Sequence, residues 1–412
     1  MHKLDFKPFD HLITYERALE IVLEHIKPVS KFECLSISDA YGRVLAEEIY
    51  AKIDMPPFTR AAMDGYALIS SCTKGASKEN PKLFKIVGTL YAGEDGSSLS
   101  VSQNTCVEVA TGAELPSGAD AVVRIEDTKR ISDTEVLVFV QVNPMTNVSK
   151  KGYDKRIGEL LFSVGEILDS RKICVLAASG NSRVKVFAKP KIVILPTGDE
   201  IVEPEKPLPK GYIYDSSSYM IYAIAIKAGC QPVRMPPVKD SLQEIRDSLI
   251  GISKSDCDMI VLIAGSSVGK RDFSADILSE IGELKFRGLR TRPGMPTLFA
   301  IVNGKPVISM PGHPVSCFVV ANVLLLPALR RLSGVTKYEP IRAKGMLVSE
   351  VRTHKDFHSF ITVRLEGEKV VPIFRHSDTT STIGISDGYI EVPIGIDKID
   401  AGTIVEVKLF EC

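Results

Sequence analysis

The segment from residue 187 to 334 constrains the fold more than any other part of the chain. Strand-like and helix-like patterns alternate there four times. The four strand-like runs, each followed by a helical pattern, are KIVILPTG, QPVRMPPV, DMIVLIAG and KPVISMPG. A repeated strand–helix order predicts parallel strands joined by right-handed crossovers. We therefore expect an α/β domain built on a parallel sheet.

Three of the four expected strands run directly into loops that combine small and polar residues. In an open parallel sheet, ligands bind outside the carboxyl ends of the strands, and the N–H groups that open the following helices attract anions. We therefore predict a ligand site where these loops meet. The candidate contacts are Thr197, Gly198, Asp199 and Glu200 after the first strand, Ser266, Ser267 and Gly269 after the third, and Pro311, Gly312, Pro314 and Ser316 after the fourth.

Each of these loops, taken alone, is equally compatible with a structural role. Gly-Asp after a strand commonly forms a turn, and Asp272 stands where the N-cap of a helix is expected. Their convergence on one edge of the sheet is what favours a ligand site.

The run GSSVGK in the third loop has some features of a phosphate-binding P-loop. A P-loop needs four residues between its glycines and Ser or Thr after the lysine. Here three residues separate Gly265 from Gly269, and Arg271 follows Lys270. We therefore exclude a nucleotide hydrolase of the P-loop type.

A cationic segment, KFRGLRTR at 285–292, contains Lys285, Arg287, Arg290 and Arg292. The whole chain has 51 Lys+Arg and 51 Asp+Glu, so this charge is local and no global field points to nucleic acid. Guanidinium and ammonium groups suit phosphate or an oxyanion. A solvated strand face is the alternative, but the position beside the loop edge favours contact with an anion.

The rest of the chain predicts helical and all-β units. Apolar residues recur at helical spacing over 14–26, a second short helix is expected from Asp39 to Glu48, and a third over 170–180. Short β-branched runs separated by turn formers over 53–140 predict an all-β insert. Similar runs after residue 335 predict a closing β-barrel.

The composition favours a soluble, cytoplasmic protein. The start, MHKLDFKPFD, lacks the apolar core of a signal peptide. The apolar stretch 317–332 is interrupted by Asn322 and Pro327 and is shorter than the ~20 residues that cross a bilayer, so we expect a buried helix. The 8 cysteines include no CxxC pair, which favours reduced thiols over a disulfide scaffold or a zinc site.

Two further clusters, at 56–67 and 111–123, are unusually rich in apolar and turn-forming residues for linkers. Either is compatible with simple hairpin chemistry, and the residues alone assign no role to them. Together with the sheet loops, however, they resemble the motifs of the molybdopterin molybdotransferase family, which includes MoeA-type proteins and the gephyrin E-domain. The motifs, in the family's order, are PPFTRAAMDGYA, ATGAELPSGADAVVRIED, KKGYD, LPTGDEIV, GYIYDSSS, SSVGKRDF, RPGMP and MPGHPVS.

The resemblance implies an L-shaped, four-domain subunit that forms a homodimer. A discontinuous, mixed helical domain would comprise residues 1–52 and 141–186, and the all-β insert would comprise 53–140. An α/β molybdopterin-binding domain would follow at 187–334, and a C-terminal β-barrel domain at 335–412. The active cleft of the family lies between the α/β domain of one subunit and the β insert of the other.

The reaction implied is the insertion of molybdenum from molybdate into adenylylated molybdopterin, with Mg²⁺-dependent release of AMP. A molybdopterin adenylyltransferase is the expected upstream partner. Asp215 and Asp272 would hold the Mg²⁺, because carboxylate oxygens suit this ion. Arg290 and Arg292 are included among the expected anion contacts, and Pro311 and Pro314 match a proline pair that shapes the loop near the phosphate. The residues matching the family's catalytic positions are Asp64, Thr111, Asp154, Asp215 and Asp272.

Some residues depart from the family pattern. The glycine loop over 264–269 is one residue shorter, His313 replaces an asparagine, and two family lysines match Gly288 and Arg292. These departures bear on catalysis more than on ligand binding, so a non-catalytic molybdopterin carrier or scaffold is the first alternative. A relative of the adenylyltransferases is the second, and the β insert and barrel disfavour it. Molybdate and tungstate are both compatible with the sequence.

Overall fold

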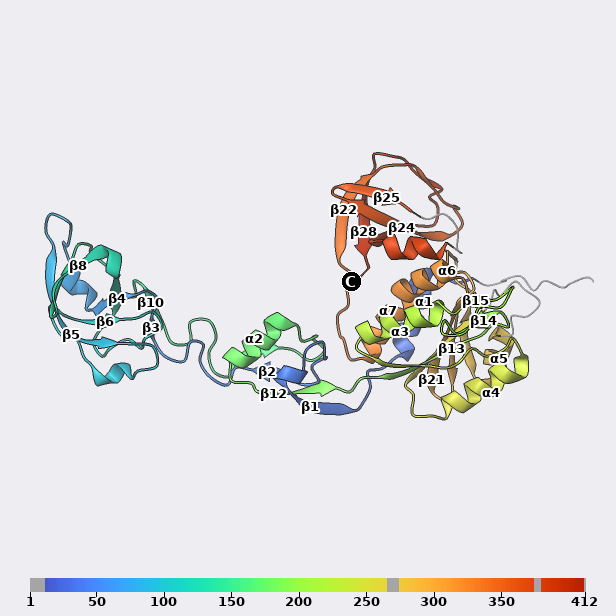
Figure 1. The fold of residues 1–412 in the computed structure, drawn as a ribbon, viewed down its shortest axis with the longest axis horizontal. Coiled ribbons are helices and arrows are strands. Elements are labelled where there is room, and N and C mark those ends of the chain that lie inside the picture. Colours follow the sequence, from blue (N-terminus) through green and yellow to red (C-terminus); the bar gives the residue numbers. More distant parts are fainter. Residues whose placement is uncertain (1–11, 265–273, 374–378, 411–412) are drawn as a thin grey trace, which may run out of the picture.

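The computed structural model describes residues 12–264, 274–373 and 379–410. This part of the chain is elongated (Figure 1). An all-β unit lies at one end, a unit built on a six-stranded sheet lies at the other, and a small mixed unit connects them. A C-terminal barrel packs beside the six-stranded unit.

The sheet between residues 187 and 334 is mixed. Its strand order is β16-β13-β17-β21-β20-β18. The first four are parallel, as the sequence predicts, whereas β20 and β18 are antiparallel additions. The β20–β21 hairpin turns at Asn303-Gly304, where both residues have positive φ and form the tight connection that suits twisted antiparallel strands. The strands are β13 (Lys191–Pro196), β16 (Gln231–Arg234), β17 (Met259–Ala264), β18 (Glu283–Arg287), β20 (Leu298–Val302) and β21 (Lys305–Pro311).

Helices cover both faces of this sheet. The helices are α1 (Tyr15–His25), α3 (Ser217–Lys227), α4 (Leu242–Ser253), α5 (Ser274–Ile281), α6 (Pro314–Val320), the π-helical turn η5 (Ala321–Leu325) and α7 (Leu326–Leu332). One core lies under α4 and α5, and the other under α3, α6, α7 and α1. The predicted helix over 14–26 is confirmed as α1. The sequence analysis grouped residues 1–52 with 141–186, but Ala18, Val22 and Ile26 of this segment lie in the core of the sheet unit.

The run Pro314–Leu332 is long and apolar enough, by composition, to cross a membrane. However, 78% of its most apolar window is buried against the rest of the protein. The run therefore forms a core helix, as the sequence analysis expected.

The unit in the middle of the molecule is here called the arm base. It contains β1 (Phe32–Ser36), η1 (Ile37–Asp39), β2 (Ile49–Tyr50), β11 (Leu160–Phe162), α2 (Ser170–Ala178) and β12 (Arg183–Phe187). The predicted helix over 170–180 is confirmed as α2, which Asp169 caps by accepting from the Lys172 N–H. The predicted helix from Asp39 to Glu48 is wrong. Gly42 breaks it at φ 74°, and the Leu45 N–H donates to the Glu166 carbonyl instead.

The expected all-β insert is formed by a six-stranded sheet of order β7-β4-β6-β5-β9-β8. Separate apolar clusters lie on its two faces. Its elements are β3 (Arg60–Ala61), β4 (Gly65–Leu68), η2 (Ser70–Thr73), β5 (Lys82–Leu90), η3 (Gly96–Ser98), β6 (Thr105–Val109), β7 (Ala121–Arg124), η4 (Ile125–Asp127), β8 (Thr128–Ser132), β9 (Glu135–Val138) and β10 (Val148–Ser149).

The C-terminal strands form a closed ring, which confirms the predicted barrel. Five strands pair in the cyclic order β24-β25-β22-β28-β26, and β26 pairs back to β24. The short strand β19 adds to β24 from the sheet unit. The elements are β19 (Thr291–Arg292), β22 (Arg342–Leu347), β23 (Val351–Arg352), β24 (His358–Glu366), β25 (Lys369–Pro372), η6 (Thr380–Ile385), β26 (Gly388–Val392), β27 (Lys398–Ile399) and β28 (Ile404–Leu409).

Candidate functional site

A cavity of about 520 Å³ opens at the carboxyl edge of the parallel strands. It brings together the loop after β13 and the loop after β21, as the strand order requires. The third predicted loop, with Ser266, Ser267, Gly269 and Asp272, lies outside the described residues. The lining residues are Pro196, Thr197, Glu200, Ile201, Ile213, Tyr214, Asp215, Ser216, Ser217, Ile263, Gly312, His313, Pro314 and Thr380.

One wall of this edge cavity is a flap made of two short parallel strands, β14 (Ile201–Val202) and β15 (Ile213–Tyr214). Glu203, which follows β14, pairs with Arg234 at 2.7 Å. The Arg234 guanidinium also lies 3.5 Å from the ring centroid of Tyr219 on α3. These interactions tie the flap to the body of the sheet unit.

Asp215 lies between β15 of the flap and the start of α3. Its side chain is buried, with 4% of the residue's surface exposed. Oδ1 accepts from the Ser218 N–H at 3.0 Å, and Oδ2 accepts from the Ser218 hydroxyl. Arg234 lies 3.6 Å from Oδ2. The carboxylate therefore holds the start of α3 in place while it lines the cavity.

A second group of carboxylates lies at the end of β13. Asp199 accepts from the Asp240 N–H at 3.2 Å, and Glu200 lies close to both. Burial, together with the neighbouring Glu200 and Asp199 charges, raises the pKa of Asp240 above its ordinary value. Thr197 lines the cavity beside them, is 6% exposed, and makes no hydrogen bond of ordinary length from Oγ1 to the described residues. The Thr197 hydroxyl nevertheless faces the Asp240 carboxyl and lowers its pKa, although burial and the neighbouring charges outweigh this effect.

Gly198 makes the bend between β13 and these carboxylates. Its φ is 149°, and a Cβ atom there would lie 2.5 Å from the Ile201 side chain. Only glycine fits this close approach. Glycine at position 198 therefore allows the chain to bend from β13 into the flap that forms one wall of the cavity.

Two helices begin at the edge cavity. Neither Ser216, the N-cap of α3, nor His313, the N-cap of α6, provides a side-chain capping hydrogen bond. Pro314 occupies the first turn of α6, and Ser316 behind it is 7% exposed. The Ser217 hydroxyl donates to the Gly312 carbonyl at 3.5 Å and joins the two loops. At the start of α3, Asp215 already accepts from the Ser218 N–H, whereas the start of α6 offers N–H donors to an anion.

Asp64 and Thr111 lie together in the all-β unit. Asp64 accepts from the Thr111 backbone N–H and hydroxyl. Both residues are exposed, and the two hydrogen bonds lower the pKa of the Asp64 carboxyl. Although the sequence analysis left both clusters unassigned before the resemblance was considered, the fold joins a residue from each.

Asp154, from the KKGYD motif, is exposed, and its backbone N–H donates to the Met55 carbonyl at 2.9 Å. Asp64 and Thr111 are on the unit at the opposite end of the molecule from β14 and β15 (Figure 1). A single chain therefore does not bring these residues to the edge cavity.

The cationic segment is not part of the cavity lining formed by the described residues. Lys285 pairs with Glu283, and Arg290 Nε donates to the Asp356 carbonyl at 2.7 Å. The Arg292 guanidinium lies 4.5 Å from the ring centroid of Phe357. These arginines contact the barrel, and their expected contact with an anion remains a prediction.

The sequence did not predict nine of the lining residues, among them Tyr214, His313 and Thr380. Tyr214 and His313 lie inside recognised motifs and could have been named. Thr380 comes from the barrel, and no pattern in the chain places a barrel residue beside the sheet edge.

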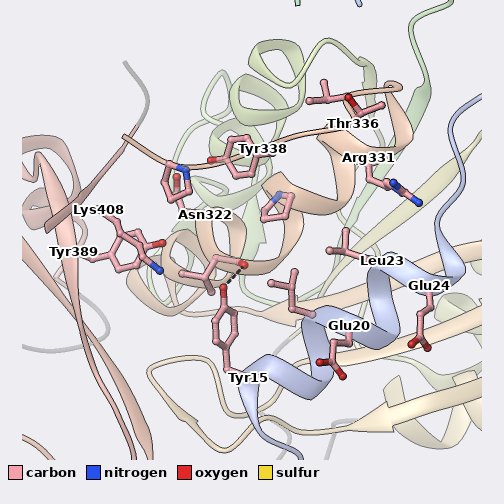
Figure 2. A pocket seen from close by; sticks show the side chains of 15 residues that line it. Tyr15, Glu20, Leu23, Glu24, Asn322, Arg331, Thr336, Tyr338, Tyr389 and Lys408 are labelled. Carbon is pink, nitrogen blue, oxygen red and sulfur yellow. Dashed lines mark hydrogen bonds between the residues drawn. The ribbon is translucent and has the colours of Figure 1, made fainter. Parts of the chain in front are cut away.

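A second cavity, of about 630 Å³, lies between α1, α7 and the barrel (Figure 2). Tyr15, which donates to the Val323 carbonyl at 3.1 Å, forms one wall, and Tyr389 and Lys408 come from the barrel. None of the predicted site residues lines it. The edge cavity is therefore the candidate site that the sequence supports.

Three regions of the chain match known protein families. Residues 13–180 match the MoeA N-terminal region (domain I and II), residues 193–331 a probable molybdopterin binding domain, and residues 344–410 the MoeA C-terminal region (domain IV). Together these matches cover nearly all of the chain.

The chain is also similar to proteins over its whole length. It is 29% identical to a molybdopterin molybdenumtransferase of Staphylococcus epidermidis, over 97% of this chain and 96% of that protein. It is 31% identical to the enzyme of that name from Staphylococcus aureus, over 92% and 91%. A crystal structure of a molybdopterin biosynthesis MoeA protein from Pyrococcus horikoshii superposes with a TM-score of 0.81 at 33% identity, covering 98% of this chain and 100% of that one.

Proposed function

Because the chain belongs to the MoeA family of molybdenum cofactor biosynthesis proteins, we propose that it is a molybdopterin molybdotransferase. In this proposal it inserts molybdenum from molybdate into adenylylated molybdopterin and releases AMP. The observation that carries the proposal is the edge cavity, in which the buried Asp215 carboxylate, the Thr197 hydroxyl and the start of α6 meet.

The edge cavity suits the phosphate groups of the substrate. The N–H groups at the start of α6 would bind phosphate oxygens, and the Thr197 hydroxyl would donate a further hydrogen bond. The flap residue Tyr214 would cover the ligand from the side of β15. Together these groups would hold the phosphoanhydride in place and limit its contact with water.

The donors present suit Mg²⁺ in part. The ion is commonly held by one or two carboxylates together with substrate phosphates and water. Asp215 offers one such carboxylate at the cavity, and Asp272, the second expected ligand, lies outside the described residues. The residues that are described contain no group of three His, Cys, Asp or Glu side chains arranged to hold a metal, so the substrate would complete the site. When bound, Mg²⁺ would stabilise negative charge on the phosphates as the anhydride breaks.

A homodimer would bring the remaining residues to the site. Asp64, Thr111 and Asp154 are far from the edge cavity of their own chain, so a partner subunit would supply them. The sheet unit has an exposed apolar face suited to such an association. Tyr222 and Ile226 on α3 are 38% and 53% exposed, and Val233 on the neighbouring edge strand β16 is 45% exposed. Unpaired sheet edges and apolar patches commonly mark interfaces.

A non-catalytic molybdopterin carrier is the second candidate. Asp215 favours it, because both carboxylate oxygens already accept hydrogen bonds from Ser218 and one lies near Arg234. A carboxylate engaged in this way is less available to a metal than a free one. The adenylyltransferase alternative is set aside, since the matches at residues 13–180 and 344–410 cover the insert and the barrel.

The test is to supply adenylylated molybdopterin, Mg²⁺ and molybdate, and to measure AMP release together with the formation of active cofactor. Both products are expected in equal amounts. Binding of the substrate without AMP release would instead support the carrier. A parallel reaction with tungstate would show which oxyanion the protein uses. Adding a molybdopterin adenylyltransferase would test whether that upstream partner transfers the substrate directly.

A further inference from the structure

The arm base joins the sheet unit through two chain segments, residues 26–31 and 188–190. The Ala188 N–H donates to the Lys31 carbonyl at 2.9 Å, so the two segments run together. The Val29 N–H donates to the Leu332 carbonyl at 3.0 Å, and Lys31 pairs with Asp256 at 3.3 Å. Two adjacent segments with few contacts form a joint that can bend unless other groups hold its angle.

Two side chains hold this angle by packing against glycines across the joint. Phe187, the last residue of β12, packs against Gly334, which follows α7. A Cβ atom on Gly334 would lie 2.6 Å from Phe187 Cε2. In the opposite direction, Thr336 packs against Gly165 of the arm base, where a Cβ atom would lie 2.6 Å from Thr336 Oγ1. The Thr336 N–H also donates to the Gly165 carbonyl at 3.4 Å.

These two contacts are reciprocal, because each unit contributes one side chain and one glycine. Rotation at the joint would therefore disturb both contacts. Both glycines have positive φ, 86° for Gly165 and 95° for Gly334, so side chains are disfavoured at these positions for two separate reasons. The segment 333–336 takes part in both contacts and leads directly to the barrel.

We infer that Phe187 and Thr336 are positioning residues that fix the angle between the arm base and the sheet unit. Because the arm base carries the all-β unit, this angle determines where Asp64 and Thr111 lie (Figure 1). The inference rests on the proposed function, in which these residues complete the edge cavity of a partner subunit. A small rotation at the joint is enlarged at the far end of the arm.

The first test measures the angle without using activity. Spin labels are attached at Asp133→Cys, on the turn between β8 and β9, and at Lys254→Cys, after α4. Cys34, Cys174 and Cys412 are replaced by serine, and labelled subunits are diluted with unlabelled ones. Phe187→Ala and Thr336→Ala are expected to broaden or shift the distance distribution between the labels. Phe32→Ala is the matched control, because Phe32 contacts Phe187 within the arm base, with ring centroids 5.4 Å apart and planes 49° apart.

The second test separates positioning from a structural role. If the angle delivers Asp64 and Thr111 to the cavity, Phe187→Ala should lower kcat for AMP release by about 100-fold, as expected for a displacement of about 1 Å at a reacting centre. The KM for adenylylated molybdopterin should change little, because the edge cavity itself is intact. Thr336→Val, which keeps the branched shape of the side chain that packs against Gly165, should retain the wild-type kcat.

An unchanged distance distribution in both alanine variants would overturn the inference, whatever their activity. A changed distribution with wild-type kcat would also overturn it, since the angle would then not matter for the reaction. If the wild-type protein releases no AMP, the proposed function fails, and the label distances still decide whether Phe187 and Thr336 hold the joint.

Discussion

Asp64 and Thr111, 47 positions apart in the chain, meet at one carboxylate oxygen. Asp64 Oδ1 accepts from the Thr111 N–H at 2.6 Å and from its hydroxyl at 2.7 Å. Both of these hydrogen bonds end on Oδ1. The second carboxylate oxygen, Oδ2, can therefore contact a ligand or a partner subunit. The pair therefore presents an ionised, oriented carboxylate on the surface of the all-β unit.

Replacing Thr111 with valine should raise the pKa of Asp64. The backbone N–H, which lowers this pKa most, would remain, but the hydroxyl contribution would be lost. Since the folded pKa lies below the unfolded one, the stabilising contribution of Asp64 is present above the unfolded value and lost as pH falls through the folded value. In Thr111→Val this loss should begin at a higher pH. A carbon-13 NMR titration of the Asp64 carboxyl measures the shift, and Thr111→Ser should titrate as the wild type does.

Mixed dimers should recover activity if the site is shared between subunits. Asp64→Ala inactivates the contribution of the all-β unit, and Asp272→Ala that of the sheet loop. A heterodimer of the two variants contains one intact cleft, and random mixing should restore roughly a quarter of the wild-type activity. Heterodimers that form but release no AMP would rule out the shared arrangement.

Neutralising Asp215 should destabilise the protein as well as impair catalysis. The carboxylate is buried beside Arg234 and accepts two hydrogen bonds from Ser218. Asp215→Asn leaves Arg234 without this charge and should lower the free energy of unfolding by about 1 to 3 kcal/mol. Urea unfolding measures the change. If the variant is as stable as the wild type, the contacts with Ser218 tolerate an amide. Any loss of AMP release would then be a direct effect on catalysis.

Asp240→Asn should increase stability at neutral pH. The folded pKa of Asp240 is raised, so its favourable contribution is complete below the unfolded pKa and lost as pH rises through the folded one. The asparagine side chain carries no charge, so Glu200 and Asp199 do not repel it. It also does not titrate, so its contribution to stability does not change with pH. The stability gained by Asp240→Asn over the wild type should therefore be larger at pH 7 than at pH 4. An equal gain at both pH values would contradict the assignment.

Reversing the charge of Arg290 and Arg292 should abolish stabilisation by ligand. At ~100 times its Kd, adenylylated molybdopterin should stabilise the wild type by about 2.7 kcal/mol. Arg342→Glu, on an exposed barrel strand, is the control and should keep the thermal shift. Because Arg292 also stacks on Phe357, the melting temperature of each unliganded variant is measured first. An undiminished ligand shift in the doubly reversed variant would assign these arginines to packing against the barrel.

The sequence predicted the elements whose patterns are local. The strands β13, β17 and β21 each show an apolar run, and α1 and α2 show helical spacing, so hydrophobic periodicity was sufficient for these elements. The helix expected from Asp39 to Glu48 failed because backbone pairing of residues 44–46 with distant strands outweighed a weak local preference. The strand β20 was missed although Asn303-Gly304 is a strong hairpin signal.

The candidate site was predicted where topology alone determines proximity. Thr197, Glu200, Gly312 and Pro314 meet because they follow neighbouring parallel strands. The pairing of Asp64 with Thr111, by contrast, depends on strand order in the all-β unit, which no local pattern specifies. The position of Thr380 depends on how the barrel packs on α6, and that packing is determined by contacts between segments far apart in the chain.

The packing of α1 against α7 has a consequence for synthesis on the ribosome. Ala18 and Val22 are fully buried, yet the residues that cover them on α7 are made about 300 positions later. At roughly 5 to 20 residues per second, on the order of 15 to 60 seconds pass between the two. For that time α1 has an apolar face that α7 does not yet cover. Chaperones that bind apolar segments of an emerging chain would therefore bind α1 until the sheet unit is complete.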